Sequence, residues 1–190
     1  MRLGVLGGTF DPPHLGHLLA ASDAYEALAL DRLLFVPAAQ QPFKAGRVGA
    51  SPDQRAAMCE LMLGVDARFA VDRSEIVRGG LSYTVDTLAA LAAAEPGVAL
   101  FLLIGEDLAD QLGTWRESGR IAELAEIAVM SRDAGAAAPP AGGLPMRRIA
   151  TRHVELSSTE VRARVKAGRP INGFVADPVA RYIRDTGLYR

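Results

Sequence analysis

The stretch RLGVLGGTFDPPHLGHLLAASDAYEALALDRLLFV, residues 2–36, decides the expected fold. Its first residues form a short apolar run that stops at Gly7-Gly8, and this run predicts a strand. From Leu15 to Leu28 apolar residues recur at helical spacing, and residues 32–36 form a second apolar run closed by Pro37. A strand, a helix and a strand in this order predict a β-α-β unit with parallel strands.

The alternation continues to the end of the chain. Residues 98–104 (VALFLLI) are apolar without interruption, as in a strand covered on both faces, so we expect this strand near the centre of the sheet. The segment SPDQ, residues 51–54, offers an N-cap, a first-turn proline and a capping-box glutamine; it predicts a helix that buries Met58, Leu61 and Met62. Other strands are expected at residues 69–71, 127–131 and near 148–149, and other helical segments at residues 82–94, 108–112, 121–124, 157–165 and 178–183.

This order predicts an α/β fold: a doubly wound, mostly parallel, Rossmann-like sheet with helices on both faces and a small C-terminal helical portion. The 190 residues are 49% hydrophobic and 23% charged, which is typical of a globular protein with a sizeable core. No internal repeat or linker divides them, so we expect residues 1–190 to form a single domain. The Ala-, Gly- and Pro-rich stretch 133–145 is expected to be a loop.

Charge and cysteine content narrow the possible functions. The net charge of −1 gives no reason to expect binding to nucleic acid or to a membrane surface. The longest apolar runs are far shorter than the roughly 20 residues that span a bilayer. The single cysteine, Cys59, excludes an internal disulfide and is expected to pack inside a helix. We therefore expect a protein of a reducing compartment, the cytoplasm.

The most informative segment is GGTFDPPHLGH, residues 7–17, between the first strand and the first helix. In an open α/β sheet, ligands bind in the crevice at this end of the strands. Gly7 and Gly8 let the backbone approach a ligand, and the helix N-terminus suits phosphate. His14 and His17 are three positions apart, so both side chains face the same side of a helical turn and can donate hydrogen bonds to phosphate oxygens.

Simpler interpretations of these residues stay open at this point. A glycine pair after a strand is often only a turn. Two histidines could bind a metal, but His153 is the only other histidine and the chain has no pair of thiolates, so no metal site is expected. The segment also lacks the G-x-G-x-x-G pattern of dehydrogenases and the lysine of a P-loop.

Taken together, the eleven residues resemble the signature of the nucleotidylyltransferase superfamily, in which the H-x-G-H element binds the phosphates of ATP. The segment SSTEVR, residues 157–162, resembles a second signature of that superfamily, which holds the β- and γ-phosphates. Ser and Thr at a helix start are also common N-caps, which is the simpler alternative for this hexapeptide.

Within the superfamily, the chain most resembles the bacterial nicotinate-nucleotide adenylyltransferase family. The matching pieces run through nearly the whole chain: GGTFDPPHLGH, Pro42-Phe43-Lys44, Arg55 with Met58, SYTVDTL from Ser82, Gly105-Glu106-Asp107, Trp115, SSTEVR and VARYIRDTGLY from Val179. Many relatives have a histidine where this chain has Phe43. Phenylalanine cannot bond a phosphate, so any role of that histidine falls to Lys44 or is lost.

The resemblance implies a set of site residues. The expected ATP-binding residues are Gly7, Gly8, Thr9, Phe10, His14, His17, Gly105, Asp107, Ser157, Ser158, Thr159 and Arg162. Nicotinate mononucleotide is expected to contact Lys44, Tyr83, Thr84 and Trp115. The residues expected to act in catalysis are His14, His17, Lys44 and Arg162. Magnesium is expected to arrive with ATP, keeping most of its water, and not in a carboxylate cage of the protein.

The resemblance implies that AMP is transferred from ATP to nicotinate mononucleotide, which gives deamido-NAD and pyrophosphate. The acceptor phosphate is already a competent nucleophile, so positioning and charge stabilisation should suffice. Two alternatives remain: another adenylyltransferase of the superfamily, such as the phosphopantetheine enzyme, and a nucleotide-binding sensor without turnover. ATP and nicotinate mononucleotide are the expected partners, and a homo-oligomer is possible.

Overall fold

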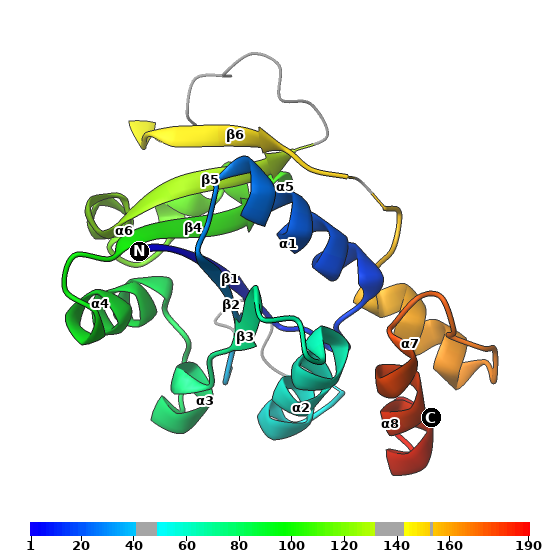
Figure 1. The fold of residues 1–190 in the computed structure, drawn as a ribbon. Helices are drawn as coiled ribbons and strands as arrows, with labels where there is room; N and C mark the ends of the chain where they lie inside the picture. Colours follow the sequence, from blue (N-terminus) through cyan, green and yellow to red (C-terminus); the bar gives the residue numbers. More distant parts are fainter. Residues whose placement is uncertain (41–48, 132–142, 153) are drawn as a thin grey trace.

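A computed structural model describes residues 1–40, 49–131, 143–152 and 154–190 (Figure 1). These residues contain a six-stranded sheet with the order β3-β2-β1-β4-β5-β6. All the neighbouring strands pair in parallel, so the sheet is more regular than the mostly parallel one that we expected. The strands are β1 (Arg2–Gly8), β2 (Arg32–Pro37), β3 (Phe69–Val71), β4 (Ala99–Gly105), β5 (Ala125–Ser131) and β6 (Met146–Ala150).

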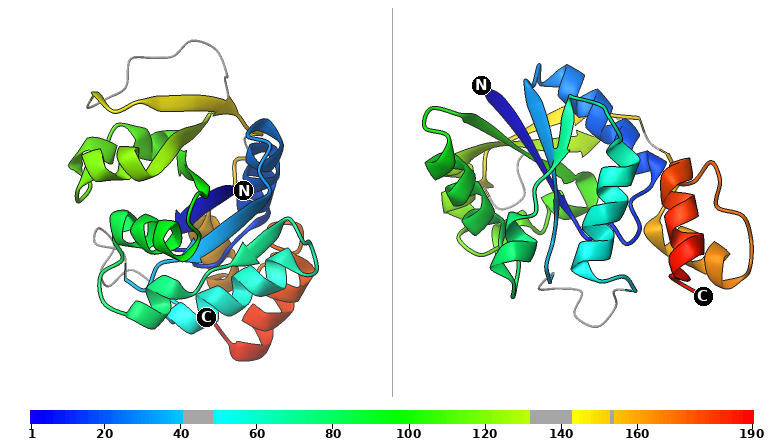
Figure 2. Two further views of the ribbon diagram at one scale, coloured as in Figure 1. Left: turned by 60° about the vertical axis from the view of Figure 1, so that its left-hand side comes forward. Right: turned by 60° about the horizontal axis from the view of Figure 1, so that its bottom comes forward.

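Helices cover both faces of the sheet, as Figure 2 shows. Successive residues of β2 separate the two faces: Leu33 and Phe35 belong to the core cluster under α1 and α2, whereas Leu34 and Val36 belong to the cluster under α4 and α6. The doubly wound architecture is therefore confirmed. The helical segments are α1 (Leu15–Ala27), α2 (Pro52–Leu63), α3 (Ser74–Arg78), α4 (Thr84–Ala94), α5 (Glu106–Ala109), the 3-10 turn η1 (Leu112–Thr114), α6 (Ser118–Leu124), α7 (Ser158–Lys166) and α8 (Asp177–Thr186).

The chain order reverses between β1 and β4. From β1 the chain winds outward through β2 to β3, and it then returns to β4 on the other side of β1 and continues to β5 and β6. Gly7 and Gly8 at the end of β1 therefore lie beside Gly105 at the end of β4. This reversal is the switch point at which open α/β sheets bind their ligands.

The local signals of the sequence set most boundaries. Ser51 caps α2: its Oγ accepts the Gln54 N–H and the Gln54 side chain accepts the Ser51 N–H, as the capping box predicts. In α2, Met58 and Met62 are buried and Leu61 is half-buried. The helix expected from Ser82 begins instead at Thr84, because Ser82 is tied to the segment after β2. Its Oγ accepts the Ala39 N–H at 2.9 Å and its own N–H donates to the Gln40 carbonyl.

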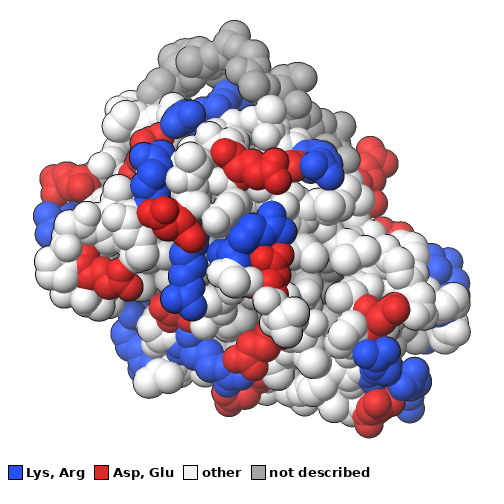
Figure 3. Space-filling model, in the orientation of Figure 1, with Lys and Arg blue, Asp and Glu red and all other residues white. Residues whose placement is uncertain are grey.

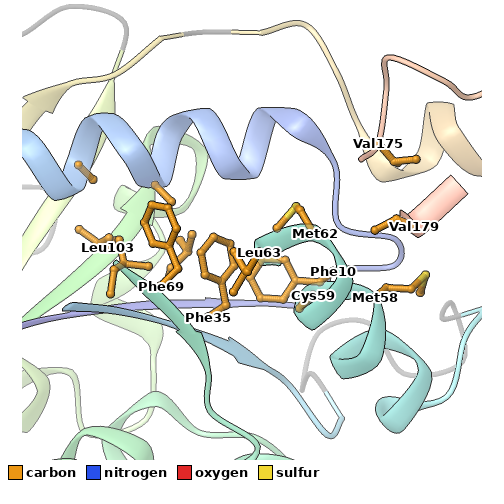
Figure 4. Close-up of a cluster of buried hydrophobic side chains, with 14 of the residues drawn as sticks. Phe10, Phe35, Met58, Cys59, Met62, Leu63, Phe69, Leu103, Val175 and Val179 are labelled. Atoms are coloured by element: carbon orange, nitrogen blue, oxygen red, sulfur yellow. The ribbon is translucent and has the colours of Figure 1, made fainter. Parts of the chain in front are cut away.

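The larger core cluster joins α1 and α2 to the C-terminal helices. In Figure 4, Phe10, Phe35 and Phe69 lie in this cluster with Met62 and Leu63 of α2. Val179 and Ile183 of α8 are buried in the same cluster, and α8 packs against α2. The C-terminal helical portion is therefore continuous with the core beside the sheet.

The surface carries both signs of charge. Basic and acidic side chains are interspersed over the face in Figure 3, in line with the net charge of −1. Across the described residues, we find no helix that is long and apolar enough to cross a membrane. The expected loop at 133–145 lies mainly outside the described residues.

Candidate active site

The H-x-G-H element forms the start of α1. His14 is the N-cap, and its backbone N–H donates to Nδ1 of His17 at 3.1 Å. A nitrogen that accepts a hydrogen bond carries no proton, so the proton of the neutral His17 ring is on Nε2. The helix cap thus fixes the tautomer of His17 with the ring proton on Nε2.

His14 has a different environment. Burial lowers the pKa of His14 from 6.5 to about 4, so the ring is neutral near pH 7. Its Nδ1 is buried and has no hydrogen-bond partner among the described residues. The two rings stack with centroids 3.7 Å apart, and a Cβ at Gly16 would come within 3.0 Å of the His14 Nδ1. The glycine of the motif therefore makes room for the His14 imidazole.

The loop before α1 is held in an unusual conformation. Phe10 has a φ of 51°, in the left-handed region that bulky residues rarely adopt. Its ring is buried, packs edge-on against His17 at 5.1 Å, and would touch a Cβ at Gly8. Such strain persists only where the surroundings hold it in place. The Phe10 side chain therefore supports His17 from the core, and only its backbone can face a ligand.

The Arg55 side chain, from α2, also bonds the loop before α1. This side chain is 1% exposed, and its guanidinium donates to the carbonyls of Thr9 at 2.7 Å, Ala38 at 2.6 Å and Ala39 at 3.1 Å. Burial lowers the pKa of Arg55, and the nearby Asp11 carboxylate opposes that shift. One side chain therefore joins the loops that follow β1 and β2. The sequence marked Arg55 only through the family resemblance.

The second signature docks directly on the first. From α7, Arg162 Nη1 donates to the Asp11 carbonyl at 2.7 Å, and the Ser158 hydroxyl donates to the Pro12 carbonyl at 2.8 Å. Arg162 also donates to the Thr159 hydroxyl at 3.2 Å. Ser157 is the N-cap of α7, since its Oγ accepts the Glu160 N–H, as the simpler interpretation predicts; the ATP contact of Ser157 stays a prediction.

A cavity of about 490 Å³ opens at the switch point, a size typical of small-molecule sites. It brings together His14, His17, Gly105 and Asp107, four of the residues expected to bind ATP. Gly105 is the N-cap of α5, and the Asp107 carboxylate reaches back so that a Cβ at Gly105 would meet it. The complete lining is Leu6, His14, Gly16, His17, Ala20, Gly105, Glu106, Asp107, Met130, Ser131, Thr151, Arg152 and Val154.

Sequence reasoning missed a polar group at this cavity, in which Glu106 and Ser131 are lining residues. Glu106 accepts the Ser131 hydroxyl at 3.0 Å and forms an ion pair with Arg148. These residues lie on α5, β5 and β6. Glu106 lies within the matching piece Gly105-Glu106-Asp107, but the sequence assigns no role to it, to Ser131 or to Arg148. The position of Glu106 and Ser131 at the carboxyl ends of β4 and β5 is the one feature that could have indicated them.

A second group of predicted residues surrounds the start of α4. Tyr83 is its N-cap and Thr84 its first residue. Tyr83 and the half-buried Trp115 pack against the same core cluster, and the Arg116 guanidinium lies 4.7 Å over the Tyr83 ring. Arg116 also lies 3.9 Å from the Asp86 carboxylate. The segment after η1 is therefore brought to the N-terminus of α4.

Comparisons with known proteins identify the family. The cytidylyltransferase-like family model matches residues 5–164. A Gemmatimonas aurantiaca protein named "Probable nicotinate-nucleotide adenylyltransferase" is 46% identical over 100% of this chain and 93% of its own length. A Thermus thermophilus protein of the same name is 44% identical over the full length of both chains. This chain belongs to the nicotinate-nucleotide adenylyltransferase family.

Solved structures support the same fold for this adenylyltransferase-family chain. The nicotinic acid mononucleotide adenylyltransferase of Plasmodium falciparum in complex with APC superposes with a TM-score of 0.78 at 15% identity, covering 99% of this chain and 96% of that one. The same protein in complex with NaAD has a TM-score of 0.77 at 16% identity, with 99% and 97% covered. At such low identity the likeness shows the fold alone.

In this family member the described site residues form three groups: one at the ends of β1 and β4, one at the start of α4, and one at the start of α7, where Ser158 and Arg162 bond the loop before α1. His14, His17, Gly105 and Asp107 line the cavity, and Gly7, Gly8 and Thr9 lead into the same loop. Tyr83, Thr84 and Trp115 lie near α4. Lys44 lies outside the described residues. No group of three His, Cys, Asp or Glu that could hold a metal ion occurs in the part of the chain that the structure describes.

Proposed function

We propose that this chain transfers AMP from ATP to nicotinate mononucleotide, giving deamido-NAD and pyrophosphate in a step of NAD biosynthesis. The observation that carries this proposal is the docking of the second signature on the first. Arg162 and Ser158 bond the backbone of the loop that leads into the two histidines, beside a cavity of nucleotide size. The full-length relatives support the choice of acceptor.

The reaction needs no covalent enzyme intermediate. An oxygen of the acceptor 5′-phosphate forms a bond to the α-phosphorus of ATP, and the bond from that phosphorus to the bridging oxygen breaks as pyrophosphate leaves. The negative charge that develops on the phosphoryl oxygens is stabilised by donors already in place. His17 supplies Nε2–H, which its helix cap orients, and His14 faces the same phosphates as a neutral imidazole.

Arg162 holds the leaving pyrophosphate. A guanidinium has five N–H donors, and those not bonded to Asp11 and Thr159 remain for phosphate oxygens. The start of α7 adds backbone N–H groups and a partial positive charge. The Ser158 hydroxyl donates to Pro12 in this structure, so its first contribution is to hold the two signatures together.

Magnesium enters with the nucleotide. The described residues offer no ligand cluster for it, and the Asp11 carboxylate accepts protein hydrogen bonds on both oxygens. In this proposal Mg²⁺ would be carried by the phosphates of ATP, where it would neutralise charge while keeping most of its water. A cytoplasmic location stays a prediction of the sequence.

The start of α4 forms the acceptor pocket. Backbone N–H groups of the first turn of α4 and the Thr84 hydroxyl donate to the nicotinate carboxylate, and Trp115 stacks on the pyridine ring. Asp86 could have repelled that carboxylate, but it lies beside the Arg116 guanidinium. Lys44 aligns the acceptor phosphate in this proposal. Residues 1–190 act as one domain, because the core cluster extends from α1 to α8.

An acceptor panel tests the proposal. Purified protein with ATP and Mg²⁺ is given nicotinate mononucleotide, its nicotinamide analogue or phosphopantetheine, and pyrophosphate release is measured. We expect about a hundredfold higher kcat/KM for the nicotinate than for the nicotinamide compound, because a carboxamide presents an NH₂ donor to donors of the pocket. Thr84→Val should reduce this preference.

Each alternative function has its own outcome in this panel. Turnover of phosphopantetheine alone would assign the chain to the other adenylyltransferase class. ATP binding without pyrophosphate release from any acceptor would make it a sensor. Equal rates with the two mononucleotides would reject the acceptor pocket while leaving AMP transfer intact.

A further inference from the structure

The Asp11 carboxylate, in the loop before the two histidines, is buried and has three partners. Its Oδ2 accepts the Gly49 N–H at 2.8 Å, and its Oδ1 accepts the Ala50 N–H at 3.1 Å and the Tyr189 hydroxyl at 2.6 Å. Two of these donors are backbone groups just before α2. The third comes from the C-terminal end of the chain, 178 positions away in the sequence.

Tyr189 is built into this position. It follows α8 with a φ of 65°, and its ring packs against the core cluster. The ring also lies so close to Gly49 that a Cβ there would come within 2.9 Å of it. Burial and the bond to Asp11 both raise the pKa of Tyr189, so the hydroxyl stays protonated and donates.

Asp11 connects this hydroxyl to Arg162. The Asp11 carbonyl accepts the bond from Arg162 Nη1, while the Asp11 carboxylate Oδ2 lies 3.9 Å from the same nitrogen. A carboxylate that lost the Tyr189 donor would gain by moving onto the Arg162 guanidinium, which is already 3.9 Å away, since a charge-assisted ion pair is stronger than a neutral hydrogen bond. That movement would draw Arg162 away from a phosphate ligand.

We infer that Tyr189 is a positioning residue for AMP transfer: its hydroxyl holds the Asp11 carboxylate off Arg162, so that the guanidinium stays aimed at the leaving pyrophosphate. This inference rests on the proposed function, because it assigns pyrophosphate to Arg162. It adds a residue from the C-terminal end of the chain to the phosphate site. Neither of the two superfamily signatures contains this residue.

The test compares Tyr189→Phe with Tyr182→Phe. Phenylalanine keeps the ring against Gly49, so the variant should fold. Tyr182 is a matched control because its ring packs on the same cluster from α8, and its hydroxyl bonds no carboxylate within the described part of the chain. Forward rates are measured with nicotinate mononucleotide, reverse rates with deamido-NAD and pyrophosphate, and melting temperatures in parallel.

For Tyr189→Phe we expect the KM for pyrophosphate to rise about tenfold and the forward kcat to fall about tenfold, the size of one charge-assisted hydrogen bond. The KM for nicotinate mononucleotide should stay within about twofold, because its ring pocket lies at α4. Tyr182→Phe should leave all constants within about twofold. If Tyr189→Phe keeps the wild-type KM for pyrophosphate and the wild-type kcat, the inference is overturned. It is also overturned if all the kinetic constants change by the same factor and the melting temperature falls with them.

A double-mutant cycle with Arg162→Ala separates positioning from general loosening of the fold. If Tyr189 acts through Arg162, adding Tyr189→Phe to Arg162→Ala should change kcat by less than about twofold. A further tenfold loss in the double variant would show an independent effect and reject the inference. Wild-type protein that makes no deamido-NAD in the same assay would instead reject the proposed function.

Discussion

The two histidines of the H-x-G-H element differ in the hydrogen bonds of their rings. His17 accepts the N-cap N–H and therefore presents Nε2–H. His14 is buried, with an Nδ1 that no described residue satisfies. Rings only 3.7 Å apart would repel each other if both were charged, so the low pKa of His14 fits a site that keeps this imidazole neutral.

His14 should make the stability of the ligand-free protein depend on pH. Its pKa is about 4 in the fold and 6.5 when unfolded, so between these values the unfolded chain binds more protons. The free energy of unfolding should therefore fall as the pH drops through this window, by about 2 kcal/mol between pH 7 and pH 5. Urea unfolding of wild type and His14→Gln at both pH values measures it. The same pH dependence in both proteins would contradict the assignment to His14.

At the scale of elements, α2 braces two loops of the site. Its capping box sets where the helix begins, and this places Arg55 one turn later under the carbonyls of Thr9, Ala38 and Ala39. The strained Phe10 follows Thr9 directly. Helix capping, a local property, therefore determines which side chain supports the loop before α1.

Arg55→Met should lower the free energy of unfolding by about 2–4 kcal/mol, because buried carbonyls lose their donors and Asp11 loses a nearby cation. Arg73→Met is the matched control. Arg73 pairs with Glu60 and Asp53 of the same helix, but its side chain is 38% exposed, so its loss should cost less than about 1 kcal/mol. Denaturant titration of both variants decides, and similar losses would show that burial does not distinguish the two arginines.

At the scale of the whole molecule, the residues that we assign to the two substrates lie in separate places along one edge of the sheet. The cavity at the ends of β1, β4 and β5 carries the residues assigned to ATP, whereas the start of α4 and the segment after η1 carry those assigned to the acceptor ring. The C-terminal helices complete the core beside the ATP side and bring Arg162 and Tyr189 to the loop.

This division predicts that Trp115→Ala weakens acceptor binding by about 1–3 kcal/mol, the worth of one stacked aromatic contact, and leaves ATP binding nearly unchanged. Trp115→Phe keeps a ring in place and should recover much of the loss. Separate titrations of the two substrates measure both effects. A loss confined to ATP would mean that Trp115 belongs to the other half of the site.

The sequence predicted the fold well where the signals are local. Apolar periodicity located all six strands, and the buried run at residues 98–104 correctly indicated a central strand. The prediction was less accurate where tertiary contacts decide the boundary: α3 is too short to show a helical period, and Ser82 is held out of α4 by Ala39 and Gln40. The two signatures indicated the proposed phosphate site, but not that Phe10 supports the loop from the core.

By itself, then, the sequence determined the order of strands and helices, the helix caps and the two phosphate signatures, because each depends on residues within a few positions of one another. Only the tertiary structure decided that Arg162 bonds the Asp11 backbone, that Arg55 bonds the carbonyls of two loops, and that the Tyr189 hydroxyl donates to the Asp11 carboxylate. These contacts join residues up to 178 positions apart. They form because buried polar groups must find partners, and the partners in reach are set by how the chain packs and not by its local pattern.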